Sequence, residues 1–315
     1  MYRLGIDLGG TNIVAGVVDE EYNIVAKASC KTDVPRPEKE ICDSMAEVAL
    51  EAIKKANITI DDVESIGIGV PGAVNPETGI IEYSANLFFH NWSVVEMMEE
   101  RLNTKVKIEN DANAAALGEY LAGSAKGAKN AVAITLGTGV GGGIIIDGKI
   151  YSGSNYAGAE LGHMVIVKDG KECGCGRKGC WEAYASATAL INMTKEAIRN
   201  EKPEFSYMLN LCDDDINNVT GKTAFDAQIA GDPTGKAVVD EYISYLACGI
   251  TNVINIFQPD VLCIGGGVSK QGDNLLNPVR AIVEAERITK HNDKQTYICT
   301  ATLGNDAGII GAAKI

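Results

Sequence analysis

The chain has 315 residues, of which 46 % are hydrophobic and 22 % are charged, and its formal net charge is −14 at pH 7. This composition is that of an ordinary globular protein and excludes disordered, collagen-like and small disulfide-rich classes; at roughly 150 residues per domain, the length corresponds to two domains. The negative charge argues against duplex nucleic acid and anionic membranes as partners, because both bind clustered cations.

The N-terminal segment, the longest uncharged stretch and the cysteines bear on where in the cell the protein resides. The N-terminal segment lacks the apolar run of a signal peptide and carries an acid at position 7. The longest uncharged stretch, 130–146, is too rich in glycine to be a membrane helix. The nine cysteines are odd in number and most are scattered, as is usual in a reducing compartment. We therefore predict a cytoplasmic protein.

The first part of the chain alternates short β-rich runs with helical patterns. Turn residues separate predicted strands at Leu4–Leu8, Ile13–Val18 and Ile24–Ser29. Apolar residues at helical spacing then predict a helix over 41–53. The remaining elements predicted for this part are strands at 65–70 and 106–109 and helices at 94–102 and 113–121.

A similar pattern then begins again. We expect strands at 131–136, 143–146, 261–264 and 297–302, helices at 235–257 and 278–288, and a short C-terminal helix. Asp147-Gly148 fits a hairpin turn, and the acidic segment 201–231 is interpreted as a solvated surface insertion. Antiparallel β structure followed by βα alternation in each half predicts two related α/β domains.

Three glycine-rich turns follow predicted strands, at 7–12, 136–143 and 264–269. Glycine lets backbone N–H groups approach an anion closely, and Asp7 precedes the first turn, where it can hold a Mg²⁺-bound water. None has the Gly-Lys-Ser/Thr ending of a Walker A loop, and the GxGxxG match at Gly137 leads into a strand instead of a helix. Each turn alone could be a tight hairpin, but the three together favour a nucleotide site.

One histidine and three cysteines have the spacing of a metal site. They are His163, Cys173, Cys175 and Cys180, and glycines separate the cysteines. A Cys₃His set satisfies tetrahedral zinc and leaves no position open for water. We therefore predict a structural zinc site; the alternative is a group of free thiols near an unrelated histidine.

Carboxylates and amides form the last constellation. The run 109–113, Glu-Asn-Asp-Ala-Asn, lies between a predicted strand and an Ala-rich helix. Its polar residues could simply cap the helix, or Asp111 could accept a proton from a substrate hydroxyl. Glu160 and Glu182 lie near the cysteine cluster, where they could accept hydrogen bonds from a polyhydroxylated ligand.

Taken together, these segments resemble the ROK family (repressor, open reading frame, kinase) of the sugar kinase–actin–heat-shock ATPase superfamily. The resemblance runs from Leu4 to the C-terminus and rests on LGIDLGGTNIVAGVVD, GVPGAVNPETG, ENDANAAALGEY, LGTGVGGGIIIDGKIYSG, GAELGHM and CGCGRKGCWEAYAS. The last two are highly specific, because the His, Cys-x-Cys-Gly-x-x-Gly-Cys order is rarely seen elsewhere.

The resemblance implies a fold and an activity. The fold would be α/β, with two ribonuclease H-like (actin-like ATPase) domains and an interdomain cleft. The N-terminal domain would comprise 1–123 plus the C-terminal helix 304–315, and the C-terminal domain 124–303 with the zinc loop. The activity would be ATP-dependent phosphorylation of glucose at the 6-hydroxyl, as in the ROK glucokinases, within glycolysis and carbohydrate metabolism.

The resemblance also implies roles for individual residues. Asp111 would be the catalytic base. The sugar would be bound by Gly72, Ala73, Asn86, Asn110, Asp111, Glu160, His163 and Glu182. ATP and Mg²⁺ would be addressed by Asp7, Gly9, Gly10, Thr11, Asn12, Thr138, Gly139, Gly266 and Gly267. Structural Zn²⁺ would be bound by His163, Cys173, Cys175 and Cys180. The chain would form a homodimer or homotetramer.

Two departures from the family pattern bear on these expectations. Ala159 stands where many relatives have glycine. No winged helix-turn-helix precedes the Asp7 motif, so we expect a kinase and not a repressor. The alternatives are a ROK kinase for N-acetylglucosamine, N-acetylmannosamine, mannose, fructose or allose, a sugar-binding regulator without catalysis, and a chaperone-like ATPase.

Overall fold

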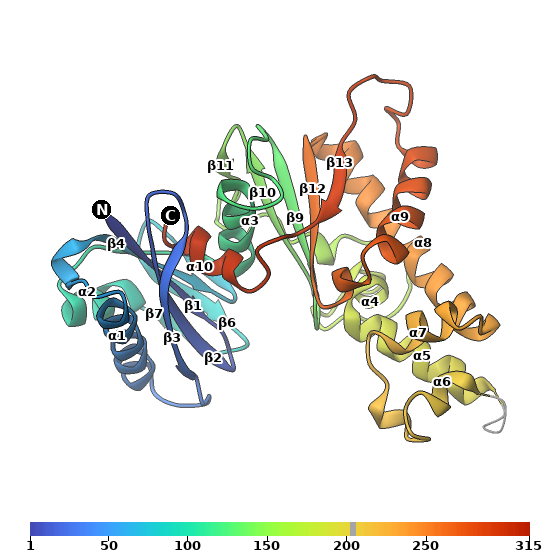
Figure 1. Cartoon of the computed structure of the whole chain (residues 1–315), viewed down its shortest axis with the longest axis horizontal. Coiled ribbons are helices and arrows are strands. Elements are labelled where there is room, and N and C mark those ends of the chain that lie inside the picture. The colour runs from blue at the N-terminus through green and yellow to red at the C-terminus, as the bar shows by residue number, and fades with distance from the viewer. Residues whose placement is uncertain (202–205) are drawn as a thin grey trace. The chain divides into compact units, whose positions relative to one another are not determined.

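The computed structural model describes residues 1–201 and 206–315, which form two compact α/β units (Figure 1). Unit 1 comprises Met1–Ala133, Gly143–Ala159 and Ala301–Ile315, and unit 2 comprises Ile134–Gly142 and Glu160–Thr300. None of the helices within the described ranges is long and apolar enough to cross a membrane.

The main sheet of unit 1 has the strand order β3-β2-β1-β4-β8. Its strands are β1 (Tyr2–Leu8), β2 (Asn12–Val18), β3 (Ile24–Lys31), β4 (Val63–Val70) and β8 (Val106–Asn110). β1, β2 and β3 are antiparallel neighbours, whereas β1, β4 and β8 run parallel. Parallel strands end at the same edge of a sheet, so the turns after Leu8 and Val70 and the start of α3 after Asn110 lie at one edge.

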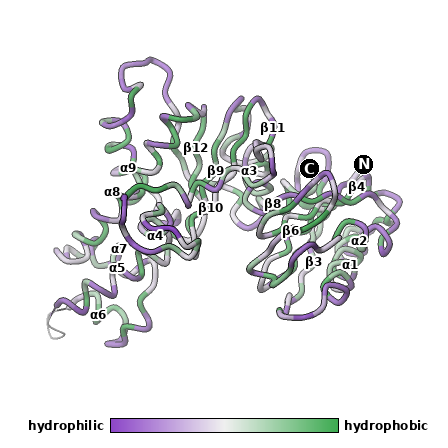
Figure 2. Tube along the Cα trace, turned by 180° about the vertical axis from the view of Figure 1, so that it is seen from behind, coloured by the Kyte–Doolittle hydropathy of each residue, from purple (hydrophilic) through white to green (hydrophobic). Residues whose placement is uncertain are grey.

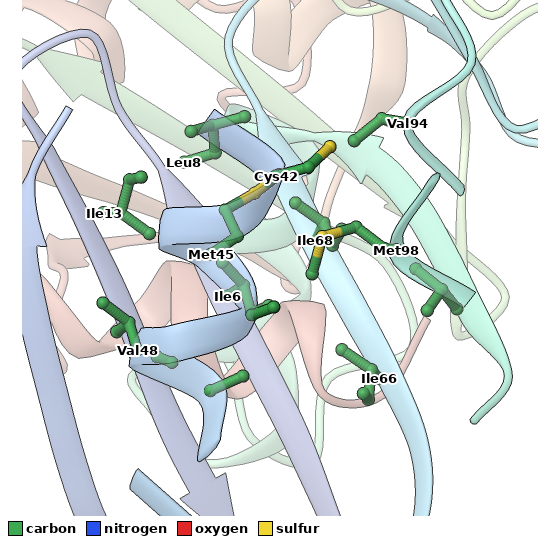
Figure 3. Close-up of a cluster of buried hydrophobic side chains, with 14 of the residues drawn as sticks. Ile6, Leu8, Ile13, Cys42, Met45, Val48, Ile66, Ile68, Val94 and Met98 are labelled. Carbon is green, nitrogen blue, oxygen red and sulfur yellow. The ribbon is translucent and has the colours of Figure 1, made fainter. Parts of the chain in front are cut away.

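One face of this sheet packs against two helices, α1 (Glu38–Lys55) and α2 (Val94–Leu102). Alternate residues of β1 point to this face, and Leu4, Ile6 and Leu8 are fully buried. Figure 3 shows Ile6 and Leu8 with Met45 of α1 and Met98 of α2 in one apolar cluster. This core fixes the strands whose ends carry the polar loops.

The other face of the sheet is lined by glycine and receives the C-terminal helix α10 (Asp306–Ala312). Gly16, Gly5 and Gly67 are neighbours in register on three adjacent strands. A Cβ on Gly5 would lie 1.9 Å from the carbonyl oxygen of Ile309, and one on Gly67 would lie 1.7 Å from that of Ala312. These glycines therefore let the backbone of α10 lie directly on the sheet, beside α3 (Asp111–Leu121).

A small antiparallel sheet, β5-β6-β7, was not predicted from the sequence. Its strands are β5 (Ala73–Asn75), β6 (Ile80–Ser84) and β7 (Phe89–Trp92). Trp92 is fully buried in the unit 1 core, whereas Phe88 is 68 % exposed and has a φ of 63°. The strands are too short for their alternation to stand out in the sequence.

The second five-stranded sheet has the order β11-β10-β9-β12-β13. Its strands are β9 (Ala131–Leu136), β10 (Val140–Ile146), β11 (Lys149–Ile150), β12 (Val261–Gly266) and β13 (Tyr297–Thr300). The hairpin predicted at Asp147-Gly148 is confirmed, because β10 and β11 pair antiparallel around this turn.

The helices of unit 2 are α4 (Glu182–Ala185), α5 (Ala187–Asn200), α6 (Tyr207–Asn210), α7 (Thr223–Ile229), α8 (Pro233–Phe257) and α9 (Asp273–Glu286). Hydrophobic residues run along α8, whereas the loop between α9 and β13 is hydrophilic (Figure 2). α9 starts five residues before the predicted position, ahead of Pro278, because Leu275 and Leu276 are buried and stabilise the first turn despite the proline.

The acidic segment 201–231 is not the solvated insertion that we expected. Met208 of α6 and Phe225 of α7 are fully buried, and α7 packs against α8. Asp213 and Asp214 are exposed, which explains the polar composition on which the interpretation was based. Within this segment, residues 202–205 lie outside the described part of the chain.

Candidate functional site

The first glycine turn joins β1 to β2 and is closed by hydrogen bonds of its own backbone. The N–H of Gly9 donates to the carbonyl of Asn12 over 2.9 Å. Thr32 holds the turn through two hydrogen bonds. Its hydroxyl donates to the carbonyl of Gly9 over 2.6 Å, and its N–H donates to the carbonyl of Thr11 over 2.9 Å. The turn is therefore a fixed loop at the edge of the sheet.

This loop lines a cavity of about 610 Å³ within unit 1. The cavity is lined by Asp7, Gly9, Gly10, Thr11 and Asn12, and by residues of β2, β3, α1 and α10. It brings together all five residues that we predicted to address phosphate and Mg²⁺ from this side. Burial first, and then the charge of Asp111, raise the pKa of Asp7 from 3.8 to about 6.

Asp111 is the first residue of α3 and follows directly on β8. Burial raises the pKa of its carboxyl, although the backbone N–H of Ala112 donates to Oδ1 over 2.9 Å and opposes that rise. A carboxylate whose pKa moves toward neutrality is suited to accept a proton in general base catalysis. Asp7 and Asp111 thus lie near each other at the same sheet edge, close enough for their charges to interact.

Asn110 precedes Asp111 and has its side chain fixed at both ends. Its Oδ1 accepts from the N–H groups of Ala112 and Asn113, at 2.9 and 3.2 Å, and so caps α3. Its Nδ2 donates to the carbonyl of Gly72 over 3.0 Å. The capping role that we weighed against a functional one is therefore real, and it falls on Asn110.

The residues predicted around the sugar in unit 1 lie together. Gly72, in the turn after β4, has a φ of 126°, and a Cβ there would lie 2.2 Å from the carbonyl oxygen of Tyr83, so only glycine fits. Ala73 begins β5. Asn86 is exposed, and its carbonyl oxygen would lie 3.1 Å from a Cβ on Gly10. The loop of Asn86 therefore borders the first glycine turn.

In unit 2, the second glycine turn is tied to Glu182. The Glu182 Oε2 atom accepts from the N–H of Val140 over 3.0 Å. A Cβ on Gly139 would lie 2.2 Å from the same oxygen, so the glycine is required for this approach. Thr138 and Gly139 thus lie in a loop whose position depends on a residue that we had predicted only as a sugar ligand.

The third glycine turn ends β12. Gly266 has a φ of 86°, and a Cβ there would lie 2.2 Å from the carbonyl oxygen of Leu136. A Cβ on Gly267 would meet no atom of the described residues within 4 Å. Gly266 is therefore required by packing against β9, whereas Gly267 borders open space that a ligand could fill.

His163, Cys173, Cys175 and Cys180 converge as the spacing predicted. Their ligand atoms all lie within 4.8 Å of one another. The sulfurs of Cys175 and Cys180 are 3.6 Å apart, and the Cys173 sulfur lies 3.7 Å from His163 Nδ1. Tetrahedral Zn–S bonds of about 2.3 Å place sulfurs about 3.8 Å apart. The two short distances match this value, so the four donors are close enough to hold a zinc ion.

His163 presents its two ring nitrogens to different neighbours. Nδ1 faces the cysteine cluster, and Nε2 lies 3.9 Å from Oε2 of Glu160. The cysteine loop is anchored next to it: Trp181 is fully buried and its Nε1 donates to the carbonyl of Tyr245 in α8 over 3.0 Å. A metal in this cluster would therefore fix the orientation of His163 and direct its Nε2 toward Glu160.

Two residues of the site were missed in the sequence. Thr32, which hydrogen-bonds to the first glycine turn, directly follows β3, and no motif around it in the sequence indicates this contact. Glu109 was noted only as part of a motif, yet it is 6 % exposed and its carboxylate holds the Asn110 turn. A carboxylate at a position where a buried strand ends is the signal that could have identified it.

Comparisons with known proteins identify the relatives of this chain. The model of the ROK family matches residues 3–315. The chain is 36 % identical over 312 residues to a glucokinase of Streptomyces coelicolor, covering 99 % of this chain and 96 % of the relative. A glucokinase of Thermotoga maritima is also 36 % identical, over 313 residues, with coverage of 99 % and 96 %.

A solved structure gives the same result at the level of the fold. The crystal structure of a ROK family glucokinase from Streptomyces griseus, in complex with glucose and AMPPNP, superposes with a TM-score of 0.82. It is 35 % identical, and the match covers 99 % of this chain and 98 % of that one. The similarity confirms the predicted fold class, and the chain belongs to the ROK family.

Proposed function

We propose that the protein is an ATP:sugar phosphotransferase that phosphorylates glucose at its 6-hydroxyl. One observation carries the proposal: a single edge of the unit 1 sheet holds both a glycine loop preceded by Asp7 and the carboxylate of Asp111. The first suits phosphate and the second suits a hydroxyl proton. The glucokinases to which the chain is similar act on the same two kinds of group.

In the proposed reaction, the oxygen of the 6-hydroxyl attacks the γ-phosphorus of ATP. The bond from that phosphorus to the β,γ-bridging oxygen breaks, and ADP leaves. Asp111 accepts the hydroxyl proton, for which its raised pKa is suited. Bound Mg²⁺ would neutralise phosphate charge near Asp7, Gly9, Gly10, Thr11 and Asn12. Most of the catalysis in such a transfer comes from positioning and charge stabilisation.

The residues that the family resemblance assigns to the sugar offer the following groups. Asn110 offers the second hydrogen of Nδ2, because the first is donated to Gly72. Glu160 offers a carboxylate and His163 offers Nε2. The carboxylate of Glu182 already accepts a hydrogen bond from the N–H of Val140 and would accept a further one from the sugar. Gly72, Ala73 and Asn86 would border the same ligand. Thr138, Gly139, Gly266 and Gly267 would face ATP.

The Cys₃His cluster would hold a structural Zn²⁺. Its four donors leave no open position, so the metal would stabilise the 160–182 segment without taking part in the chemistry. The family resemblance extends the proposal to an enzyme of carbohydrate metabolism that assembles as a homodimer or homotetramer. The cysteine usage and the net charge of −14 extend it to a cytoplasmic protein that does not bind nucleic acid or membranes.

The decisive experiment measures ADP release with Mg-ATP across a panel of hexoses and N-acetylhexosamines. We expect strong turnover with glucose and weak turnover with the others. Preference for an acetylated sugar, or for mannose, fructose or allose, would keep the mechanism and reassign the substrate. Absence of sugar-stimulated turnover would contradict the proposal and favour a non-catalytic sugar-binding regulator, and turnover that ignores sugars would favour a chaperone-like ATPase.

The role of Asp111 has its own test in the same assay. Asp111→Asn keeps the shape of the side chain but removes the proton acceptor, so we expect turnover to fall by about 100-fold or more. The affinity for sugar, measured by calorimetry, should change little. Asp43→Asn, which changes an exposed acid of α1 in the same unit that pairs with Arg101, serves as the control. A turnover of Asp111→Asn above about a tenth of the wild-type value would exclude Asp111 as the base.

A further inference from the structure

Glu109 is a buried carboxylate that hydrogen-bonds to residues on both sides of Asp111. We call Asn110 and Asp111, where β8 passes into α3, the catalytic turn. Glu109 lies next to last in β8 and is 6 % exposed. Its Oε1 accepts two hydrogen bonds, one from the backbone N–H of Asn110 at 2.9 Å and one from Nδ2 of Asn113 at 3.0 Å. Burying a carboxylate destabilises the folded state unless hydrogen bonds satisfy its oxygens. These two bonds run to either side of Asp111.

Asn113 is even more deeply buried, at 2 % exposure, and its side chain is only half satisfied. Nδ2 donates to Glu109, but Oδ1 has no hydrogen-bond partner among the residues that the structure describes. Turning the amide over would place Oδ1 against the carboxylate of Glu109, which repels it. Glu109 therefore sets the orientation of Asn113, and the unsatisfied oxygen costs stability.

Asn110 lies between these two residues and has little freedom left. Its N–H is held by Glu109, its Oδ1 by the first turn of α3, and its Nδ2 by the carbonyl of Gly72. Asp111 is the next residue. The direction in which the chain leaves β8 and enters α3 therefore depends on the carboxylate of Glu109, through the one bond to the Asn110 N–H.

We propose that Glu109 and Asn113 form a positioning pair for the catalytic turn. Glu109 fixes Asn110, and through it Asp111, and Asn113 acts only by holding the carboxylate of Glu109 in place. Neither residue needs to touch a substrate. The proposal rests on the proposed function, because it assigns the pair to the geometry of the groups that would bind the sugar and accept its proton.

The pair predicts an ordered set of kinetic effects. Glu109→Ala removes the acceptor of the Asn110 N–H, and we expect kcat with glucose to fall by about 10- to 100-fold, since small displacements of reacting groups have effects of that size. KM for ATP should change by less than about threefold. Glu109→Gln keeps a side-chain oxygen that accepts both bonds, so it should restore kcat to within about threefold.

A double-mutant cycle tests whether Asn113 acts through Glu109. Asn113→Ala should reduce kcat less than Glu109→Ala does, and the double variant should be no slower than Glu109→Ala alone. Glu119→Gln is the matched control, because Glu119 is a carboxylate of α3 with 2 % exposure that holds the N–H groups of Ser124, Thr302 and Leu303. It should lower the melting temperature and leave kcat within about twofold.

Hydrogen exchange gives a readout that does not depend on catalysis. Glu109→Ala should accelerate exchange at the Asn110 amide, and Glu109→Gln should not. If the wild-type protein shows no sugar-dependent ADP release, the proposed function fails, and exchange alone then decides the positioning role. The pair is overturned if Glu109→Ala keeps kcat within twofold, if exchange at Asn110 is unchanged, or if the two single losses multiply in the double variant.

Discussion

The carboxylate of Glu182 accepts a hydrogen bond from the backbone N–H of Val140, with 3.0 Å between Oε2 and the nitrogen. Its other oxygen lies 3.7 Å from the sulfur of Cys173. One side chain therefore contacts both the second glycine loop and the cysteine cluster, although these lie far apart in the sequence. The loop that we propose to face ATP is held in place by the segment that we propose to bind zinc.

This contact predicts the behaviour of Glu182 variants. Glu182→Ala leaves the N–H of Val140 without its acceptor, and a hydrogen bond to a charged group contributes about 1.5–3 kcal/mol. We expect KM for ATP to rise by about tenfold or more, in addition to any loss of sugar affinity. Steady-state kinetics with ATP and glucose varied separately measure both effects.

Glu172→Ala is the control for Glu182, because Glu172 is an exposed acid of the same segment that pairs with Lys178. It should leave KM for ATP within twofold. If Glu182→Ala raises only KM for glucose, the carboxylate contributes to the sugar site alone, and the contact with Val140 has no effect on ATP.

The metal cluster predicts that the protein carries one zinc ion per chain, measurable by elemental analysis. Removing zinc with a chelator should lower the melting temperature and increase proteolysis between residues 160 and 182, because binding free energy at a structural site is folding free energy. Cys175→Ser should reproduce both effects, and Cys248→Ser, a thiol outside the cluster, should not. A metal-free protein with unchanged melting temperature and activity would contradict the structural role.

Local pattern was enough to predict much of the fold. Strands β1, β2 and β4 and helices α1 and α2 follow from alternation or helical spacing, because each buries one face against a common core. The Cys₃His cluster also followed from spacing, since its ligands lie close together in the chain. These features depend on neighbours within one element or one loop.

Contacts between distant segments could not be predicted in this way. Nothing in the sequence near Glu182 indicates that it contacts Val140. The acidic residues of the 201–231 segment likewise concealed α7, in which Phe225 is buried and which packs against α8. The same holds for the need for glycine at positions 5, 16 and 67, which is evident only once the sheet places Gly5, Gly16 and Gly67 in register against α10. Tertiary packing determines which residues are required at these positions, and the local pattern of a single sequence carries no information about such packing.

Asp7 predicts a pH dependence of stability. Its pKa is raised from 3.8 to about 6 by burial and by the charge of Asp111, so the folded state favours the protonated form. The stability associated with that proton is complete below about pH 4 and is lost as the pH rises through 6. Asp7→Asn should therefore stabilise the ligand-free protein above pH 6, by about 3 kcal/mol for a shift of this size.

Urea unfolding of the wild type and of Asp7→Asn at pH 5 and pH 7.5 measures this difference. The gain should be larger at pH 7.5 than at pH 5. Asp43→Asn is the control, since Asp43 is exposed and pairs with Arg101 away from the cavity of Asp7, and its effect should change little between the two values. An equal effect of Asp7→Asn at both would show that the carboxyl titrates normally.

The glycine-lined face of the unit 1 sheet predicts a strong steric effect. Gly67→Ala would place a Cβ 1.7 Å from the carbonyl oxygen of Ala312, so α10 would have to move off the sheet. We expect a loss of about 3 kcal/mol or more in the free energy of unfolding. Gly267→Ala meets nothing within 4 Å and should stay within about 0.5 kcal/mol. Similar values for the two variants would contradict the close packing of α10.

Substitution of Ala159 by glycine should raise the free energy of unfolding instead of lowering it. Ala159 has a φ of 65°, in the left-handed region, where an L-residue other than glycine costs about 1–2 kcal/mol. Ala159→Gly removes this strain but loosens the unfolded chain, which costs about 0.4–1 kcal/mol, so we expect a net gain of about 0.5–1 kcal/mol. Ala157→Gly, two residues away and outside the positive-φ set, should instead destabilise the protein by a few tenths of a kcal/mol or more. Urea unfolding of both variants compares the two signs, and a loss at Ala159 would show that the methyl group has packing contacts that outweigh its strain.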